Sequence, residues 1–143
     1  MPSVTKVHTF NGSLEKVLSG IKKYSHYKDF ITAVNEIEVL PPKEDGSAAQ
    51  VSYKIKLIKT IYYTLNMFES EKNKVSWTLE ESNIMSKNNG YWAFKDLGEN
   101  SVEATYHLDI KFKGLVPSSI ATKMTETQIP KLFEQMQALI DSL

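Results

Sequence analysis

Residues 101–113 read Ser-Val-Glu-Ala-Thr-Tyr-His-Leu-Asp-Ile-Lys-Phe-Lys, and this stretch decides the fold. Apolar side chains occupy every second position from Val102 to Phe112, with polar side chains between them. A period of two is typical of a strand that buries one face. At about 3.3 Å per residue the strand spans about 40 Å, so we expect it to bend around another element.

A long helix is predicted directly after this strand. Gly114 ends the strand, and Pro117 suits the first turn of a helix that we expect to run to Leu143. Pro130 lacks an N–H, which predicts a kink or a short break just before it. Apolar residues recur at spacings of three and four and form one stripe along the helix: Ile120, Met124, Ile129, Leu132, Phe133, Met136, Leu139, Ile140 and Leu143.

The preceding part of the chain supplies further strands and two short helices. The sequence Asn88-Asn89-Gly90 predicts a turn. Within the strand predicted over 58–70, the pattern leaves open whether the face of Tyr63 or that of Tyr62 is buried. The patterns predict short helices over 14–21 and 22–30, and strands over 4–10, 34–40, 49–57, 58–70, 75–80, 91–97 and 101–113.

This order of elements predicts an α+β fold in which the long helix lies across a curved antiparallel sheet of about seven strands. A helix is about 10 Å wide, whereas the strands of a sheet lie about 4.8 Å apart. One helix therefore leaves part of the buried face uncovered. We expect a cavity between sheet and helix, and this cavity is the functional hypothesis.

Composition excludes several other functions. The chain has 143 residues, which suits one domain over 1–143, and its 17 basic and 17 acidic residues give a net charge near zero. No Arg is present, so a nucleic-acid surface is not expected. Cys is absent, which excludes disulfides and thiolate sites. No apolar leader segment opens the sequence, so a cytoplasmic location is expected.

The predicted ligand site consists of side chains on the inward faces of the strands and of the long helix. Large inward side chains also build ordinary cores, and that alternative stays open at this point. Gln128 is the polar group expected to orient a ligand, and Met124 would give a deformable wall. The full set is Tyr53, Ile55, Leu57, Tyr63, Leu65, Trp77, Trp92, Phe94, Tyr106, Leu108, Met124, Gln128 and Leu132.

No catalytic residue, metal site or cofactor is predicted. His8, His26 and His107 are the only histidines, and none has a carboxylate or a second histidine at metal-ligand spacing. The chain contains no Gly-rich phosphate loop and no Gly-x-Ser-x-Gly motif.

Four segments resemble a known family. These are Tyr27-Lys-Asp-Phe30 with the strand after it, Trp77-Thr-Leu79, Gly90-Tyr-Trp-Ala-Phe94, and Val116-Pro117 with Gln128-Ile-Pro130. They resemble the helix-grip fold of the START and pollen-allergen-like superfamily. They are most similar to its polyketide cyclase/dehydrase and lipid-transport (SRPBCC) family, and more distantly to coenzyme-Q-binding and ribosome-association toxin proteins.

The resemblance implies binding of a hydrophobic small molecule, such as a lipid, a quinone or a polyketide-like compound. The alternatives are an aromatase/cyclase-type enzyme and a protein-interaction module. Some relatives place arginines on the strands around the cavity, and because this chain has none, charge-paired binding of an anionic ligand is not expected.

A basic surface is the remaining feature. It comprises Lys54, Lys56 and Lys59, with Lys111 and Lys113 on another strand. The simplest interpretation is a solvated face that discourages edge pairing. The alternative is transient docking to an anionic membrane or an acidic protein.

Overall fold

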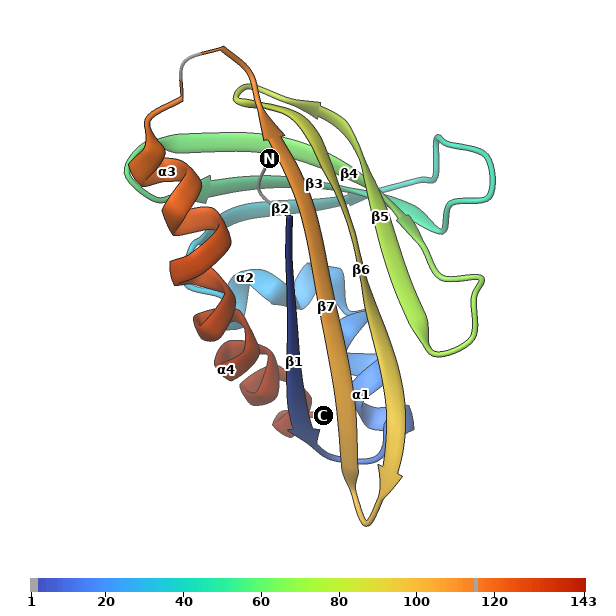
Figure 1. The fold of residues 1–143 in the computed structure, drawn as a ribbon. Helices are drawn as coiled ribbons and strands as arrows, with labels where there is room; N and C mark the ends of the chain where they lie inside the picture. The colour runs from blue at the N-terminus through green and yellow to red at the C-terminus, as the bar shows by residue number, and fades with distance from the viewer. Residues whose placement is uncertain (1–2, 115) are drawn as a thin grey trace.

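The computed structural model describes residues 3–114 and 116–143, and a curved antiparallel sheet dominates it (Figure 1). Its strand order is β1-β7-β6-β5-β4-β3-β2, so every neighbouring pair except β1 and β7 is consecutive in the chain. The predicted seven-stranded sheet is thus confirmed. The strands are β1 (Ser3–Asn11), β2 (Val34–Leu40), β3 (Ala49–Lys56), β4 (Thr60–Phe68), β5 (Lys74–Ser82), β6 (Met85–Gly98) and β7 (Ser101–Phe112).

The two short helices fill the connection between β1 and β2. The first, α1 (Leu14–Ile21), is capped by Ser13, whose hydroxyl accepts a hydrogen bond from the backbone N–H of Lys16 at 3.1 Å. A short 3₁₀ turn, η1 (Tyr24–His26), leads into α2 (Tyr27–Phe30). Tyr24 and Tyr27 are buried, so this segment closes one end of the sheet.

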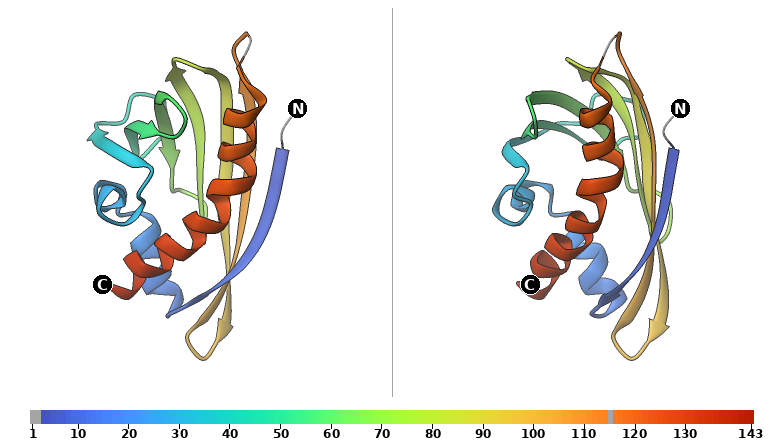
Figure 2. Two further views of the ribbon diagram at one scale, coloured as in Figure 1. Left: turned by 90° about the vertical axis from the view of Figure 1, so that its left-hand side faces the viewer. Right: turned by 60° about the vertical axis from the view of Figure 1, so that its left-hand side comes forward.

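The C-terminal helix lies across the inner side of the sheet (Figure 2). It comprises α3 (Ser118–Thr122), the π-helical segment η2 (Lys123–Thr127) and α4 (Gln128–Asp141). The prediction of an irregularity just before Pro130 is confirmed, and the irregularity is a π-helical segment rather than a break. The helix axis changes direction partway along, as the left view of Figure 2 shows.

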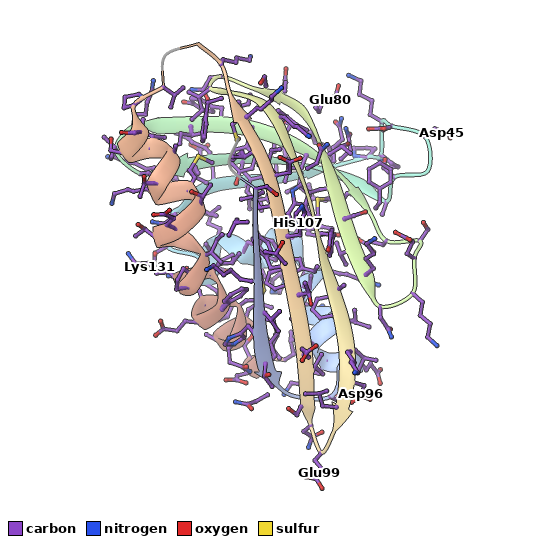
Figure 3. All side chains as sticks on the ribbon, in the orientation of Figure 1. Asp45, Glu80, Asp96, Glu99, His107 and Lys131 are labelled. Carbon is purple, nitrogen blue, oxygen red and sulfur yellow. The ribbon has the colours of Figure 1, made fainter. Side chains whose placement is uncertain are left out.

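The alternating pattern of β7 buries one face of the strand, as predicted. Val102, Ala104 and Ile110 are completely buried, and Tyr106 and Leu108 share their face. The alternate residues Glu103, Thr105, His107 and Asp109 are half-buried on the outer face. The hairpin turn between β6 and β7 carries Glu99, at the tip in Figure 3, and Asn100, both with positive φ. The turn therefore lies between the strands predicted over 91–97 and 101–113, although β6 begins earlier, at Met85.

The predicted turn at Asn88-Asn89-Gly90 is wrong. These residues lie inside β6, which begins at Met85, and Asn88 pairs with Ile110 of β7. The reversal between β5 and β6 lies at Asn83 and Ile84 instead. Asparagine and glycine are turn residues in isolation, but here each has a tertiary role, described below, that requires an extended backbone.

The loop between β2 and β3, residues 41–48, contacts the outer face of the sheet at β5. Glu44 of this loop accepts a hydrogen bond from Thr78 at 3.2 Å, and Lys43 pairs with Glu80 at 2.6 Å. Beneath the loop, Asn66 is almost fully buried and its amide donates to Glu80 at 3.2 Å. This explains why both faces of β4 are buried near its end.

Candidate functional site

A cavity of about 160 Å³ lies between the inner face of the sheet and the C-terminal helix, and it opens to the surface. An engineered apolar cavity of about 150 Å³ is large enough to bind benzene. The space present in this conformation therefore suits a ligand of one ring, and a larger ligand requires the walls to move. The predicted cavity exists, although it is small for a lipid or a quinone.

The strands β3 to β7 form one wall of the cavity and the helix forms the other. Tyr27 at the start of α2, the connection between α2 and β2, and Val34 at the start of β2 complete it. No charged side chain lines it within the part of the chain that the structure describes. The lining residues are Tyr27, Ile31, Ala33, Val34, Tyr53, Ile55, Leu57, Tyr63, Leu65, Met67, Trp77, Asn88, Trp92, Tyr106, Leu108, Ile110, Met124, Gln128, Ile129, Leu132, Gln135 and Met136.

Nearly all the residues predicted for the ligand site come together around this cavity. The exception is Phe94, which is buried and stacks on Trp92 with ring centroids 5.9 Å apart, behind the lining. The open question about β4 is also answered, since Tyr63 and Leu65 face the cavity. The residues on the wall are Tyr53, Ile55, Leu57, Tyr63, Leu65, Trp77, Trp92, Tyr106, Leu108, Met124, Gln128 and Leu132.

The lining also includes residues that were not in the predicted set. Met67, Ile110, Ile129 and Met136 continue the inward faces of their strands and of the helix. Ile31, Ala33 and Val34 reach the cavity from the α2–β2 connection. Asn88 was missed because its sequence context predicted a turn. Gln135 lies two turns beyond Gln128 on the helix, and this spacing could have identified it.

Aromatic rings form most of the deep wall. Tyr53 and Tyr63 are partners across β3 and β4, and their rings stack at 4.8 Å with planes 15° apart. Tyr106 contacts both indoles, at 4.7 Å from Trp92 and 5.7 Å from Trp77. Such packing fixes the ring positions, so the cavity has a defined shape before any ligand binds.

Burial changes the acid–base behaviour of the tyrosines. It raises the pKa of Tyr53, Tyr63 and Tyr106, because an apolar environment disfavours the phenolate. The nearby hydroxyls of Tyr27, Tyr63 and Tyr106 raise the pKa of Tyr53 further. These phenols are therefore neutral hydrogen-bonding groups at physiological pH.

Asn88 holds one indole of the wall in place. Its Oδ1 accepts a hydrogen bond from Nε1 of Trp77 at 3.0 Å, and both residues are buried. Within the described part of the chain, the hydrogen-bond partner of its amide nitrogen is the thioether of Met85, at 3.7 Å. Since a thioether is a weak acceptor, this N–H group remains available at the cavity.

Two tyrosines connect the short helices to the rest of the fold. The hydroxyl of Tyr24 donates to Oε2 of Glu69 at 2.5 Å, just beyond the end of β4. The hydroxyl of Tyr27 donates to the backbone carbonyl of Ile21, at the end of α1. Both hydroxyls already have protein partners, whereas the hydroxyls of the strand tyrosines have none among the residues that the structure describes.

The histidines lie outside the cavity lining. His8 stacks on Phe133 at 4.8 Å, and burial lowers its pKa. His107 lies on the outer face of β7 (Figure 3), where Nδ1 is 2.7 Å from the hydroxyl of Thr5. His26 is exposed. No group of His, Asp and Glu that could hold a metal ion occurs among residues 3–114 and 116–143.

A second hollow lies along the outer part of β3, β4 and β5, where the pairing of β4 and β5 shifts in register. It is larger, about 420 Å³, but polar side chains such as Ser52, Thr64 and Glu81 contribute much of its lining. It therefore offers little apolar burial, and the inner cavity is the better ligand site.

Two of the basic residues singled out in the sequence have partners within the fold. Lys54 pairs with Glu36 at 2.8 Å, and Lys113 donates to the carbonyl of Ser82 at 2.6 Å. Lys56 and Lys59 flank the exposed Ile58 at the turn between β3 and β4. This turn adjoins the cavity, because Leu57 is part of the lining.

Comparison with known proteins identifies the family to which this chain belongs. The family model described as polyketide cyclase / dehydrase and lipid transport matches residues 11–137. Because this match spans most of the sequence, the chain belongs to that family. The resemblance found in four sequence segments is thereby confirmed. No curated protein matches the chain.

Solved structures show the same fold at low sequence identity. A START superfamily protein from Mycobacterium smegmatis has a TM-score of 0.85 at 16% identity, covering 98% of this chain and 97% of that one. An aromatase/cyclase from a Streptomyces species has a TM-score of 0.78 at 13% identity, covering 99% and 92%. A norcoclaurine synthase from Thalictrum flavum, in complex with dopamine and hydroxybenzaldehyde, has a TM-score of 0.71 at 8% identity, covering 99% and 87%. The helix-grip prediction is confirmed.

Membrane insertion through a helix is not a feature of the described chain. Within residues 3–114 and 116–143, every helix is too short or too polar to cross a bilayer.

Proposed function

We propose that this protein binds an uncharged hydrophobic small molecule, of the lipid, quinone or polyketide-like kind, in the cavity beneath the C-terminal helix. One observation carries the proposal: the cavity is open to the surface and its described lining is apolar and aromatic, without a charged side chain. Burial of apolar surface supplies about 25 cal/mol per Å², and ligand pockets typically have this composition.

Larger ligands require a gate, which we place at η2 and at the segment from η1 to α2. The π-helical geometry of η2 weakens the regular hydrogen bonding of the helix, and π-helical segments are frequent at functional sites. Met124 of η2 lies on the cavity wall, and its flexible side chain can adapt to a ligand. Hydrogen exchange tests the gate: amides of η2 should exchange more slowly when the cavity is filled.

An aromatase/cyclase-type enzyme is the second candidate. The observation in its favour is the group of tyrosine hydroxyls and the Asn88 amide in one cavity, and one structural neighbour is named an aromatase/cyclase. Neutral phenols can polarise a carbonyl. Proton abstraction needs a base, and the described lining has no carboxylate, imidazole or amine, which favours binding over turnover.

Contact with an anionic membrane would fit the β3–β4 turn, which adjoins the cavity lining. Ile58 is 55% exposed at the β3–β4 turn, between lysines and next to the lining residue Leu57. Co-sedimentation with phosphatidylserine vesicles would detect such docking, and I58D should abolish it. A protein-interaction role predicts a filled core, which a cavity of about 160 Å³ does not match.

Binding of N-phenyl-1-naphthylamine, an uncharged fluorescent probe, tests the main proposal. Leu65→Trp places a large ring in the cavity and should weaken probe binding at least about 10-fold, because the ring occupies the space that the probe needs. Leu132→Trp does the same nearer the surface, in case the first variant fails to fold. The matched control is Leu97→Trp, at an exposed site outside the cavity lining.

Extraction of the purified protein gives an independent test. Protein isolated from cells should release apolar compounds into organic solvent, and L65W should release less. A protein that takes up no probe after extraction, and that carries no apolar compound before it, would overturn the proposal.

A further inference from the structure

Three tyrosine hydroxyls on the cavity wall have no protein partner within residues 3–114 and 116–143. They belong to Tyr53, Tyr63 and Tyr106, all of which line the cavity. Tyr53 and Tyr106 are 8% and 9% exposed, so each is more than nine-tenths buried. The hydroxyls of Tyr24 and Tyr27, by contrast, donate to Glu69 and to the carbonyl of Ile21.

The unpaired hydroxyls are in contact with the hollow itself. In the described chain, no fully enclosed side-chain nitrogen or oxygen lacks a hydrogen-bond partner. An unpaired hydroxyl must therefore keep some accessible surface. Tyr106 lines the inner cavity, whereas Tyr53 and Tyr63 line both the inner cavity and the second hollow. Buried polar groups of native proteins are nearly always paired, so an unpaired set beside a cavity indicates a ligand that completes it.

These groups present donors rather than charges. Each phenol is neutral and carries an O–H, and Asn88 adds an N–H whose partner in the described part of the chain is a thioether. The described wall has no charged side chain, so an ionised ligand would lose its hydration without gaining an oppositely charged partner. The chemistry of the wall fits a neutral ligand that accepts hydrogen bonds.

The arrangement of the rings adds a requirement on shape. On the sheet wall, Tyr53 and Tyr63 stack nearly parallel, and Tyr106 lies against the Trp77 and Trp92 indoles. This aromatic wall favours a ligand with a planar ring of its own, since aromatic groups gain most from offset or edge contacts with other rings.

We propose that the ligand is an uncharged, planar carbonyl compound, whose oxygen accepts hydrogen bonds from the hydroxyls of Tyr53, Tyr63 and Tyr106. This inference rests on the proposed function and narrows it. Quinones and polyketide-like compounds carry such carbonyls, whereas a simple hydrocarbon chain would leave the three donors unpaired.

Two compounds of the same shape test the carbonyl. Acetophenone and α-methylstyrene are single-ring molecules that differ in C=O against C=CH₂, and both suit the volume of the cavity. Isothermal titration calorimetry should show acetophenone binding about 3- to 10-fold more tightly, as expected for one added hydrogen bond. In the triple variant Y53F/Y63F/Y106F this preference should disappear, while α-methylstyrene should bind as well as before.

Tyr62→Phe is the control, because Tyr62 neighbours Tyr63 but is 51% exposed and does not line the inner cavity. If the triple variant fails to fold, the single variants Y53F and Y106F should each reduce the preference. Equal affinities in the unaltered protein, or a preference that survives in the triple variant, would overturn the carbonyl inference and leave apolar binding intact. If neither compound binds, the proposed function itself fails.

Discussion

Gly90 and Trp77 are partners across β5 and β6, and a Cβ atom on Gly90 would lie 2.5 Å from Cζ2 of the Trp77 indole. The same Cβ atom would also collide with the backbone carbonyl of His107. Glycine is required here for close approach, not for a turn. The absent side chain lets one indole of the cavity wall lie flat against β6.

Gly90→Ala should destabilise the protein by about 3 kcal/mol, because backbone and ring must both move to make room. Urea unfolding followed by tryptophan fluorescence measures the loss. Gly46→Ala is the control: its Cβ meets nothing within 4 Å, but its φ of +81° should cost about 1 kcal/mol. Equal losses for the two variants would contradict the close contact.

Asn88→Ala should cost about 2 kcal/mol, since it leaves the buried indole N–H of Trp77 without an acceptor. In a ¹H–¹⁵N spectrum, the indole signal of Trp77 should move upfield while that of Trp92 changes less. Asn89→Ala, at the neighbouring half-buried position, should change neither the stability nor this signal. An unchanged Trp77 signal in the Asn88 variant would contradict the hydrogen bond.

Stability should fall above about pH 10 because of the buried tyrosines. Burial raises the pKa of Tyr24, Tyr27, Tyr53, Tyr63 and Tyr106 above the ordinary value of 10.0. Above that pH the unfolded chain loses phenol protons while the folded chain keeps them. The contribution of these tyrosines to the free energy of unfolding is therefore fully present below pH 10 and is lost as the pH rises.

Urea midpoints between pH 8 and pH 11 measure this effect. Each tyrosine contributes a slope of up to about 1.4 kcal/mol per pH unit. Tyr106→Phe removes one of them, so its profile should be less steep than that of the unaltered protein. Identical slopes would show that Tyr106 ionises without unfolding.

His8 should make stability depend on pH on the acid side. Its pKa lies below the ordinary value of 6.5 because the ring is partly buried against Phe133. The unfolded chain therefore binds the proton first, and stability should decrease as the pH falls below about 6.5. Melting temperatures at pH 7.5, 6.5 and 5.5 should show this decrease, and His8→Phe should reduce it. A variant with the same pH profile would rule His8 out as its source.

Regular elements with one buried face were the most predictable part of the fold. The alternation in β7 and the stripe of the C-terminal helix each extend over ten or more residues, so local pattern and tertiary burial agree. Prediction failed at Asn88-Asn89-Gly90, where local turn preference was overridden by contacts to Trp77 and to β7. The phase of β4 was unreadable because Asn66 and Met67 are both buried there, one under a loop and one at the cavity.

The sequence by itself determined most of the elements and their antiparallel order, because these follow from periodicity and turn residues. Its composition also determined that the cavity lining contains no cysteine or arginine. Only the tertiary structure decided the size of the cavity and the meeting of Tyr53, Tyr63 and Tyr106. The cavity is the volume that remains after a curved sheet and a bent helix have packed together. No local sequence pattern encodes the size of that volume. Tyr53 and Tyr63 are partners on the consecutive strands β3 and β4, whereas Tyr106 comes from β7, far along the chain, and the folded sheet places all three around one cavity.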